Sequence, residues 1–161
     1  MSTPRSASQI PRGPVVFDAS FLIALLDGED AAQRFTPVLS RGIVPAVTAG
    51  EVFYKLHAAA GIDSTRLEGA LNALGITLVD LPVAAALQFP ALKSIDRLRR
   101  EEQKRTGGRR VQALSLGDLC CLGYALHTQL PVLTADRHWT TLAAHGLTVA
   151  VHDFRDPGTT P

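Results

Sequence analysis

Four acidic side chains stand where this sequence is expected to bring polar groups to one edge of a sheet. Asp18 and Asp136 each close a short apolar run, and Glu51 and Asp118 lie near the start of expected helices. A carboxylate at the end of a buried parallel strand faces the crevice where α/β proteins bind ligands. We therefore expect these four residues to meet at one site.

Gathering four carboxylates requires a counter-charge. At a separation of roughly 6 Å and an effective dielectric of about 20, two carboxylates repel by about 3 kcal/mol. Summed over all pairs, this repulsion is comparable to the whole stability of a small domain, roughly 5–15 kcal/mol. Hard divalent cations remove it, and oxygen ligands without Cys or His partners favour Mg²⁺ or Mn²⁺, as one or two ions. Such a site activates water for in-line attack on a phosphodiester.

The same acids have a simpler interpretation as helix caps. Glu51 and Asp118 each follow a Thr or Ser three residues earlier, which is the spacing of a capping box or nearly so. A strand-ending Asp, such as Asp18 or Asp136, is often the N-cap of the next helix. Capping and metal binding are compatible, and the conjunction of all four acids is what favours a functional site.

Composition predicts one intracellular domain. The chain has 161 residues, of which 46% are hydrophobic and 19% are charged, enough for one buried core. The only cysteines, Cys120 and Cys121, are neighbours that would close no useful loop, which indicates a reducing, cytoplasmic setting. No apolar run approaches the ~20 residues of a membrane span, and residues 1–8 lack the apolar core of a secretory signal.

Short apolar runs alternate with helical patterns along the chain. The runs expected to be buried strands are 14–18, 43–47, 76–79, 131–135 and 147–151. The segments expected to be helices are 20–27, 30–40, 48–60, 64–74, 82–105, 115–128 and 137–145. This alternation predicts a parallel sheet with helices on both faces. Pro90 should split the helix at 82–105 and leave its second half as a polar, basic projection.

The two ends of the chain are expected to be disordered. Residues 1–13 are rich in Ser, Pro, Gly and Arg, and residues 156–161 read Asp-Pro-Gly-Thr-Thr-Pro. Between them, residues 14–155 are expected to form a single domain.

Three segments, taken in order, resemble a known family. They are residues 16–26, 114–122 and 131–139, and Glu51 fits the acid that the family places between the first and second of them. Together they resemble the PIN domain and, within it, the VapC-like toxin ribonucleases of bacterial toxin–antitoxin pairs. The resemblance implies a PIN-like, Rossmann-like α/β fold of three layers, α/β/α, around a five-stranded parallel sheet. It also implies endonucleolytic cleavage of single-stranded or loop RNA.

The resemblance also implies roles for individual residues and partners. It assigns the role of catalytic metal ligand, directly or through water, to four residues: Asp18, Glu51, Asp118 and Asp136. Ser20 and Thr134 match hydroxyl positions that would orient a carboxylate or a ligated water, although capping explains them equally well. The family tends to form homodimers and to pair with a small antitoxin protein, and we expect both of this chain.

A basic stretch at 93–112 matches no motif of that family. Residues 93–110 carry eight Lys or Arg against three Asp or Glu, a net +5, which leaves −4 on the rest of the chain. This helical arm could bind an RNA backbone. The candidate RNA contacts are Lys93, Arg97, Arg100, Lys104, Arg105, Arg109, Arg110 and, beyond the arm, Arg137. The alternatives are a solvated helix with ion pairs such as Arg97–Glu101 or Asp96–Arg100, and a docking surface for the acidic tail of an antitoxin.

Two other functions fit the sequence less well. A phosphatase with Asp18 as its nucleophile would need a second Asp two residues on, where this chain has Ser20. A catalytically silent RNA- or protein-binding module would have no reason to keep all four acids. The histidines show no zinc-type pairing and are not expected to be ligands: His57, His127, His138, His145 and His152.

Overall fold

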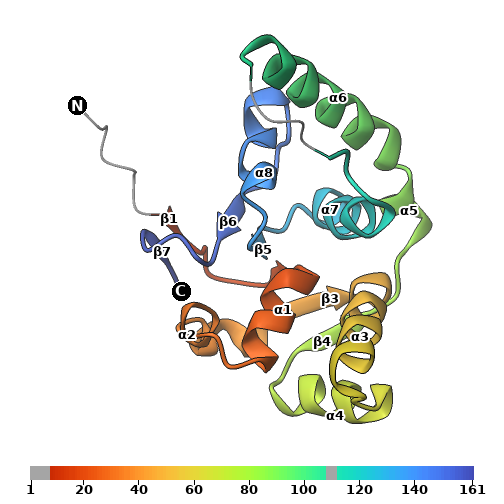
Figure 1. Ribbon diagram of the computed structural model, residues 1–161, viewed down its shortest axis with the longest axis vertical. Coiled ribbons are helices and arrows are strands. Elements are labelled where there is room, and N and C mark those ends of the chain that lie inside the picture. Colours follow the sequence, from red (N-terminus) through yellow and green to blue (C-terminus); the bar gives the residue numbers. More distant parts are fainter. Residues whose placement is uncertain (1–7, 108–111) are drawn as a thin grey trace.

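A five-stranded parallel sheet lies at the centre of the computed structural model, which describes residues 8–107 and 112–161 (Figure 1). In spatial order its strands are β4 (Thr77–Val79), β3 (Gly42–Pro45), β2 (Val15–Phe17), β5 (Val132–Thr134) and β6 (Val151–Asp153). The predicted five-stranded α/β fold is confirmed. The last strand begins at Val151, although the apolar run predicted a strand at 147–151, because Leu147 and Val149 pack into the core ahead of the ladder.

Strand β2 is the central strand, and the chain adds two strands on each side of it. It first adds β3 and β4 on one side, and later returns to add β5 and β6 on the other. Strands β2 and β5 are therefore neighbours whose connections run in opposite directions, which is where open α/β sheets bind ligands. Asp18 directly follows β2, and Asp136 follows β5 by two residues.

Helices fill the connections between the strands. They are α1 (Ala19–Leu26), α2 (Asp30–Gln33), the 3₁₀ helix η1 (Thr36–Arg41), α3 (Ala46–Ala60), α4 (Ser64–Ala73), α5 (Val83–Ala86), α6 (Phe89–Arg105), α7 (Leu116–Thr128), α8 (Arg137–Thr140) and the 3₁₀ helix η2 (Leu142–His145). Within the described part of the chain, none of these helices has the length and apolar character needed to cross a membrane.

The central strand β2 contributes side chains to two hydrophobic cores, one on each face of the sheet. Val15 and Phe17 pack with α1 to α4 on one face, and Val16 packs with α5 to α8 on the other. Gly42, on the neighbouring strand, leaves the space that the Phe17 ring occupies, since a Cβ atom there would overlap the ring. The sheet is the middle of three layers (Figure 1).

The predicted split near Pro90 occurs, but α6 is not a polar projection. Pro90 stands in the first turn of α6, and α5 ends before it. Leu92, Asp96 and Arg99 are buried on one face of α6, which packs on α7 and η2. The spacing of these three residues puts them on one side of the helix, and ion pairing allows the two charged ones to be buried.

The described parts of the two ends are paired with each other, where the sequence predicted disorder. Strand β1 (Ser8–Gln9) pairs in parallel with β7 (Thr159–Thr160), and we call these two strands the terminal clasp. The Ser8 amide donates to the Gly158 carbonyl at 3.0 Å, and Ile10 is 3% exposed. Each end supplies the hydrogen-bond partners that the other lacks, so a polar composition did not prevent pairing.

Candidate active site

Asp18 is a buried carboxylate at the carboxyl end of β2. It is 8% exposed and caps α1, and its Oδ2 accepts hydrogen bonds from Ser20 Oγ at 2.6 Å and Thr134 Oγ1 at 2.9 Å. Burial raises the pKa of Asp18, the two hydroxyl donors oppose that rise, and the charge of Asp118 adds to it. The Asp18 site therefore favours a bound proton or a bound cation.

Ser20 and Thr134 link Asp18 to the segment that carries Asp136. The Ser20 hydroxyl accepts from the Ala135 amide at 2.9 Å, and the Thr134 hydroxyl accepts from the Asp136 amide at 3.0 Å. Both hydroxyls at the same time donate to Asp18. They therefore fix the first acid relative to the fourth across β2 and β5.

Asp118 is part of a capping box at the start of α7. Its Oδ2 accepts from the Ser115 amide at 2.7 Å, and its own amide donates to Ser115 Oγ at 3.2 Å. Burial raises the pKa of Asp118, the bonds from Ser115 lower it, and the charges of Asp136 and Glu51 raise it further. The capping interpretation of Asp118 is correct, and its electrostatic contact with the other acids is present as well.

Glu51 is not a helix cap, because α3 begins earlier than its sequence pattern indicated. The N-cap of α3 is Pro45, no side chain bonds there, and Thr48 is buried inside the helix. Glu51 Oε1 accepts from Lys55 Nζ at 2.6 Å. Its other oxygen lies beside Gly117 of α7, since a Cβ atom at Gly117 would stand 2.9 Å from Oε2. Glu51 thus faces the turn that carries Asp118.

Asp136 caps the short helix α8 and lines a cavity together with Asp118. Its Oδ1 accepts from the His138 amide at 2.8 Å. We call this cavity, of about 390 Å³, the acid cavity. It is lined by Arg99, Gln112, Ala113, Leu114, Ser115, Asp118, Asp136 and His138.

The four predicted acids are electrostatic neighbours with Asp118 in common. Each has one carboxylate oxygen hydrogen-bonded and leaves the other without a partner among the described residues. Among those residues, however, no three His, Cys, Asp or Glu side chains converge closely enough to hold a metal ion together. Asp118 and Asp136 line the acid cavity together, and Asp18 and Glu51 interact with the charge of Asp118, so the meeting of all four acids at one metal site stays a prediction.

This donor set suits a hard divalent ion. Mg²⁺ is usually held by one or two carboxylates, with waters and substrate phosphates completing its shell. Asp118 and Asp136 could serve as direct ligands, and Asp18 and Glu51 could act through water. Burial raises the pKa of Asp18 and of Asp118, and the charges of neighbouring acids raise both further, so a bound cation would stabilise the ionised carboxylates.

Arg99 also lines the acid cavity, although its sequence pattern indicated only one more charge in a basic stretch. It is 4% exposed, and its Nη2 donates to Asp96 Oδ1 and to the Gln112 carbonyl. Its Nε and Nη1 are buried and have no hydrogen-bond partner among the described residues. The spacing from Leu92 to Arg99 places both on one helix face, and this was the signal that could have identified it.

Much of the expected RNA-binding arm is engaged in internal contacts. Arg97 pairs with Glu101 at 4.0 Å, and Arg100 pairs with Asp96 at 3.1 Å, as the solvated-helix alternative proposed. Lys93 donates to the Leu114 carbonyl at 2.7 Å.

The remaining candidates for RNA contact differ in their surroundings. Lys104 and Arg105 are exposed in the last turn of α6 and form no ion pair within the described residues. Arg137 pairs with Asp153 at 3.3 Å, but its side chain is 77% exposed. Arg109 and Arg110 lie outside the described residues.

Comparison with known proteins identifies the fold independently. The PIN-domain family model matches residues 15–144. No curated protein matches the sequence. Similar solved structures include the DNA-bound VapBC from Salmonella typhimurium, with 16% identity over 88% of this chain and 98% of that one, at a TM-score of 0.58.

Two further structures share the fold. A toxin–antitoxin complex from Klebsiella pneumoniae has 21% identity over 91% of this chain and 96% of that one, at a TM-score of 0.55. FitAcB from Neisseria gonorrhoeae has 19% identity over 88% of this chain and 99% of that one, also at 0.55. At these identities the likeness establishes the architecture and leaves the chemistry to be argued from the residues.

Proposed function

This chain belongs to the PIN-domain family, and from that premise we propose that it is a metal-dependent endoribonuclease, the toxin of a toxin–antitoxin pair. The observation that carries the proposal is the position of Asp118, whose charge interacts with Asp18, Glu51 and Asp136. PIN-domain nucleases generally use divalent metals. The shared fold with the Klebsiella toxin–antitoxin complex supports the toxin assignment.

The four acids would hold Mg²⁺ or Mn²⁺, with Asp118 and Asp136 as direct ligands. When bound, such an ion supplies positive charge to the phosphate and lowers the pKa of water. The protein supplies orientation: Ser20 and Thr134 fix one oxygen of Asp18 and leave the other available. With water as the nucleophile, the products carry a 3′-hydroxyl and a 5′-phosphate.

Arg99 would hold the scissile phosphate. Its side chain lines the same cavity as Asp118 and Asp136, and its buried Nε and Nη1 have no hydrogen-bond partner among the described residues. Guanidinium groups bind phosphate oxygens by parallel hydrogen bonds, and burial makes those bonds stronger. We expect Lys104, Arg105 and Arg137 to bind flanking phosphates of a single-stranded or looped RNA, because their side chains are exposed.

The test is RNA cleavage by matched variants. Structured RNAs are incubated with Mn²⁺ and wild type, Asp18→Asn, Asp118→Asn or Asp80→Asn, the last being an exposed acid after β4. We expect losses of about a hundredfold or more for the first two variants, none for Asp80→Asn, and none of the cleavage to survive excess chelator. Equal cleavage by all variants, or cleavage in chelator, would overturn the proposal.

The same assay separates the two rival functions. A phosphatase would yield a phosphoaspartyl adduct at Asp18 on phosphomonoesters. A silent module would bind RNA without cutting it, whether or not Mn²⁺ is present.

We further propose that the chain forms a homodimer through apolar residues on neighbouring helices. Val83 of α5 and Leu87, the residue that follows α5, are 77% and 72% exposed, and Tyr54 of α3 is 73% exposed. Helices α3 and α5 both pack on α7. We propose that these side chains form one apolar patch, and such patches are typical of an interface. Light scattering should give a dimer mass for wild type and a monomer mass for Leu87→Glu.

The exposed end of α6 is also the proposed contact for an antitoxin. Lys104 and Arg105 have no acidic partner among the described residues, so the acidic tail of a small antitoxin could pair with them. Such a tail would compete with RNA. A purified complex with the antitoxin should therefore bind RNA more weakly than the free protein does.

A further inference from the structure

Side chains of α6 bind the backbone of the segment that leads into α7. Both polar backbone groups of Leu114 are bound in this way: its amide donates to Asp96 Oδ2 at 3.1 Å, and its carbonyl accepts from Lys93 Nζ at 2.7 Å. Arg99 Nη2 donates to the Gln112 carbonyl at 3.2 Å. We call Lys93, Asp96 and Arg99 the α6 clamp.

The segment depends on this clamp because it has no regular structure of its own. Residues 112–115 belong to no helix or strand, and among the described residues no backbone group bonds to the backbone of residues 112–114. Leu114 is 4% exposed and packs in the core with α5 to α8, so its amide and carbonyl need partners within the protein. Helix α6 supplies a partner for each.

Leu114 directly precedes the cap of α7. Ser115 is the N-cap, and its two hydrogen bonds with Asp118 use the Asp118 amide and one oxygen of the Asp118 carboxylate. A movement of Leu114 therefore shifts Ser115 and turns this carboxylate. Leu114, Ser115 and Asp118 all line the acid cavity, so the clamp determines the shape of one of its walls.

Asp96 can hold Leu114 without adding net negative charge to the site. It is fully buried, and Arg99 Nη2 and Arg100 Nε both donate to its carboxylate. A buried carboxylate is stable in a folded protein when it is paired and hydrogen-bonded in this way. Asp96 therefore presents a fixed acceptor to the Leu114 amide.

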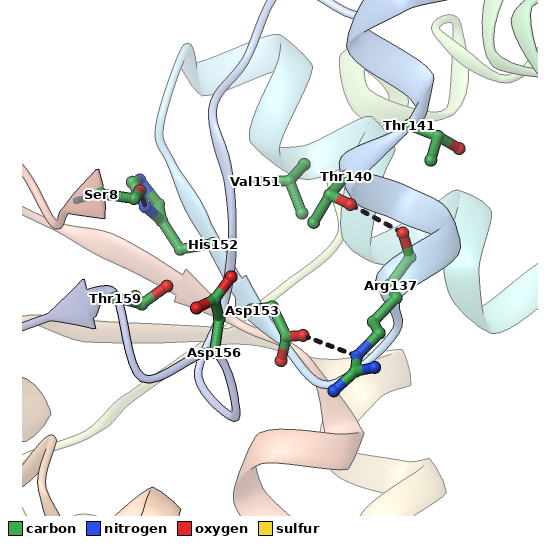
Figure 2. Close-up of a pocket in the computed structure, with 9 residues that line it drawn as sticks. All are labelled: Ser8, Arg137, Thr140, Thr141, Val151, His152, Asp153, Asp156 and Thr159. Atoms are coloured by element: carbon green, nitrogen blue, oxygen red, sulfur yellow. Dashed lines mark hydrogen bonds and ion pairs between the residues drawn. The ribbon is translucent and has the colours of Figure 1, made fainter. Parts of the chain in front are cut away.

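Asp136, the other acid of the cavity, is held by different elements. Figure 2 shows the next residue, Arg137, with its guanidinium directed at Asp153 of β6 and its carbonyl bonded to Thr140. The distance from Arg137 Nε to Asp153 Oδ2 is 3.3 Å, and Thr140 Oγ1 donates to the Arg137 carbonyl at 2.7 Å. These bonds come from α8 and β6, so a change in the clamp should alter Asp118 and leave Asp136 in place.

We propose that Lys93 and Asp96 are positioning residues, which bind both backbone groups of Leu114 and thereby keep the free carboxylate oxygen of Asp118 available to a divalent cation. This inference rests on the proposed function, because it concerns the metal site of the proposed nuclease. Loss of a group that orients a metal ligand typically weakens metal binding by roughly ten- to a hundredfold.

The deciding variant is Lys93→Met, because Lys93 is exposed and its loss leaves no buried charge unpaired. Mn²⁺ is titrated calorimetrically into the full chain. We expect Lys93→Met to bind Mn²⁺ about tenfold more weakly than wild type does. Electrostatics alone predict the opposite sign, since removing a cation beside an acidic site should strengthen the binding of Mn²⁺.

Three further variants complete the test. Lys93→Arg keeps a cationic donor for the Leu114 carbonyl and should bind Mn²⁺ with wild-type affinity. Lys104→Met removes the same charge from the exposed end of α6 and should also leave Mn²⁺ affinity unchanged. Asp96→Asn disturbs the bond to the Leu114 amide and should weaken Mn²⁺ binding by about tenfold or more.

NMR of the metal-free protein shows which side of the cavity has changed. In Lys93→Met the amides of Ser115 and Asp118 should shift, whereas that of His138, which is bonded to Asp136, should not. Mn²⁺ affinity in Lys93→Met that equals or exceeds that of wild type would overturn the inference even if wild type cleaves RNA. Weaker Mn²⁺ binding by Lys93→Met in a protein that cuts no RNA would support the positioning role and count against the proposed ribonuclease.

Discussion

Gly117 of α7 and Glu51 of α3 are in close contact: a Cβ atom added at Gly117 would stand 2.9 Å from Oε2 of Glu51. The missing side chain at Gly117 is what lets a carboxylate from α3 approach the first turn of α7. That turn carries Asp118, so the small residue brings two of the acids within electrostatic reach. The close packing of α3 on α7 at Gly117 therefore affects the proposed metal site.

Substituting Gly117 should therefore change catalysis more than stability. Gly117→Ala has to displace the Glu51 carboxylate, which can move because it ends a flexible side chain. We expect kcat/KM for RNA to fall about tenfold, equivalent to about 1.4 kcal/mol, with little change in Tm. The control is Gly69→Ala on α4, where a Cβ atom meets nothing within 4 Å. Unchanged cleavage by Gly117→Ala would mean that the position of the Glu51 carboxylate does not affect catalysis.

Asp18 should make the metal-free protein less stable as pH rises. Its pKa in the folded state is raised above the ordinary value of an Asp side chain, mainly by burial. A raised carboxyl pKa means that the folded state holds the proton more tightly, so the stabilisation is full below the unfolded pKa and is lost as pH rises through the folded pKa. Asp18→Asn removes this loss.

The advantage of Asp18→Asn should accordingly be small near pH 4 and larger near pH 7. At neutral pH we expect a Tm about 3 °C above wild type in excess chelator, the shift that roughly 1 kcal/mol produces in a domain of this size. Thermal melts at a series of pH values measure it. A difference in Tm that does not vary with pH would contradict the buried-carboxylate explanation.

Substituting Arg99 should reduce RNA cleavage, whereas substituting the nearby Arg97 should not. Arg99→Lys keeps the charge beside Asp96 but loses the planar guanidinium of a residue that lines the acid cavity. We expect kcat/KM to fall about tenfold or more. Arg97→Lys is the matched control on the same helix, since Arg97 is exposed and its pair with Glu101 is long, at 4.0 Å. Equal activity of the two variants would remove Arg99 from the phosphate site.

The exposed cations at the end of α6 should appear in the salt dependence of RNA binding. The double substitution Lys104→Ala with Arg105→Ala, in an Asp118→Asn background that binds without cutting, should reduce the slope of log K against log salt by about 1.4. Filter binding at several salt concentrations measures it. Arg66→Ala on α4 is the control and should leave the slope as it is. An unchanged slope for the double variant would mean that the exposed end of α6 is solvated and does not contact RNA.

The sequence predicted the elements that depend on local pattern. Short apolar runs and glycine stops located the five strands and most helices, and the strand-ending position of Asp18 and Asp136 follows from the same pattern. The start of α3 was missed because Thr48 resembles a cap in sequence but is buried within the helix. A capping pattern in the sequence does not reveal whether the helix begins before that pattern, because tertiary packing decides where the helix starts.

What the sequence could not supply depends on contacts between distant segments. The pairing of Ser8 with Thr159 joins the two ends of the chain, and neither strand has an apolar pattern of its own. The burial of Arg99 depends on Asp96 and on the Gln112 carbonyl, which a helix that reads as basic does not indicate. The sharing of one cavity by Asp118 and Asp136 likewise appears only when α7 and β5 are placed together.

The most direct test of the central claim is a calorimetric titration of Mn²⁺ into wild type, Asp118→Asn and Asp80→Asn. Because Asp118 is the common neighbour of the other three acids, its neutralisation should weaken Mn²⁺ binding by about tenfold or more, while Asp80→Asn binds as wild type does. Equal Mn²⁺ affinity in wild type and Asp118→Asn, or no binding by wild type, would contradict the assignment of these carboxylates as a metal-dependent nuclease site.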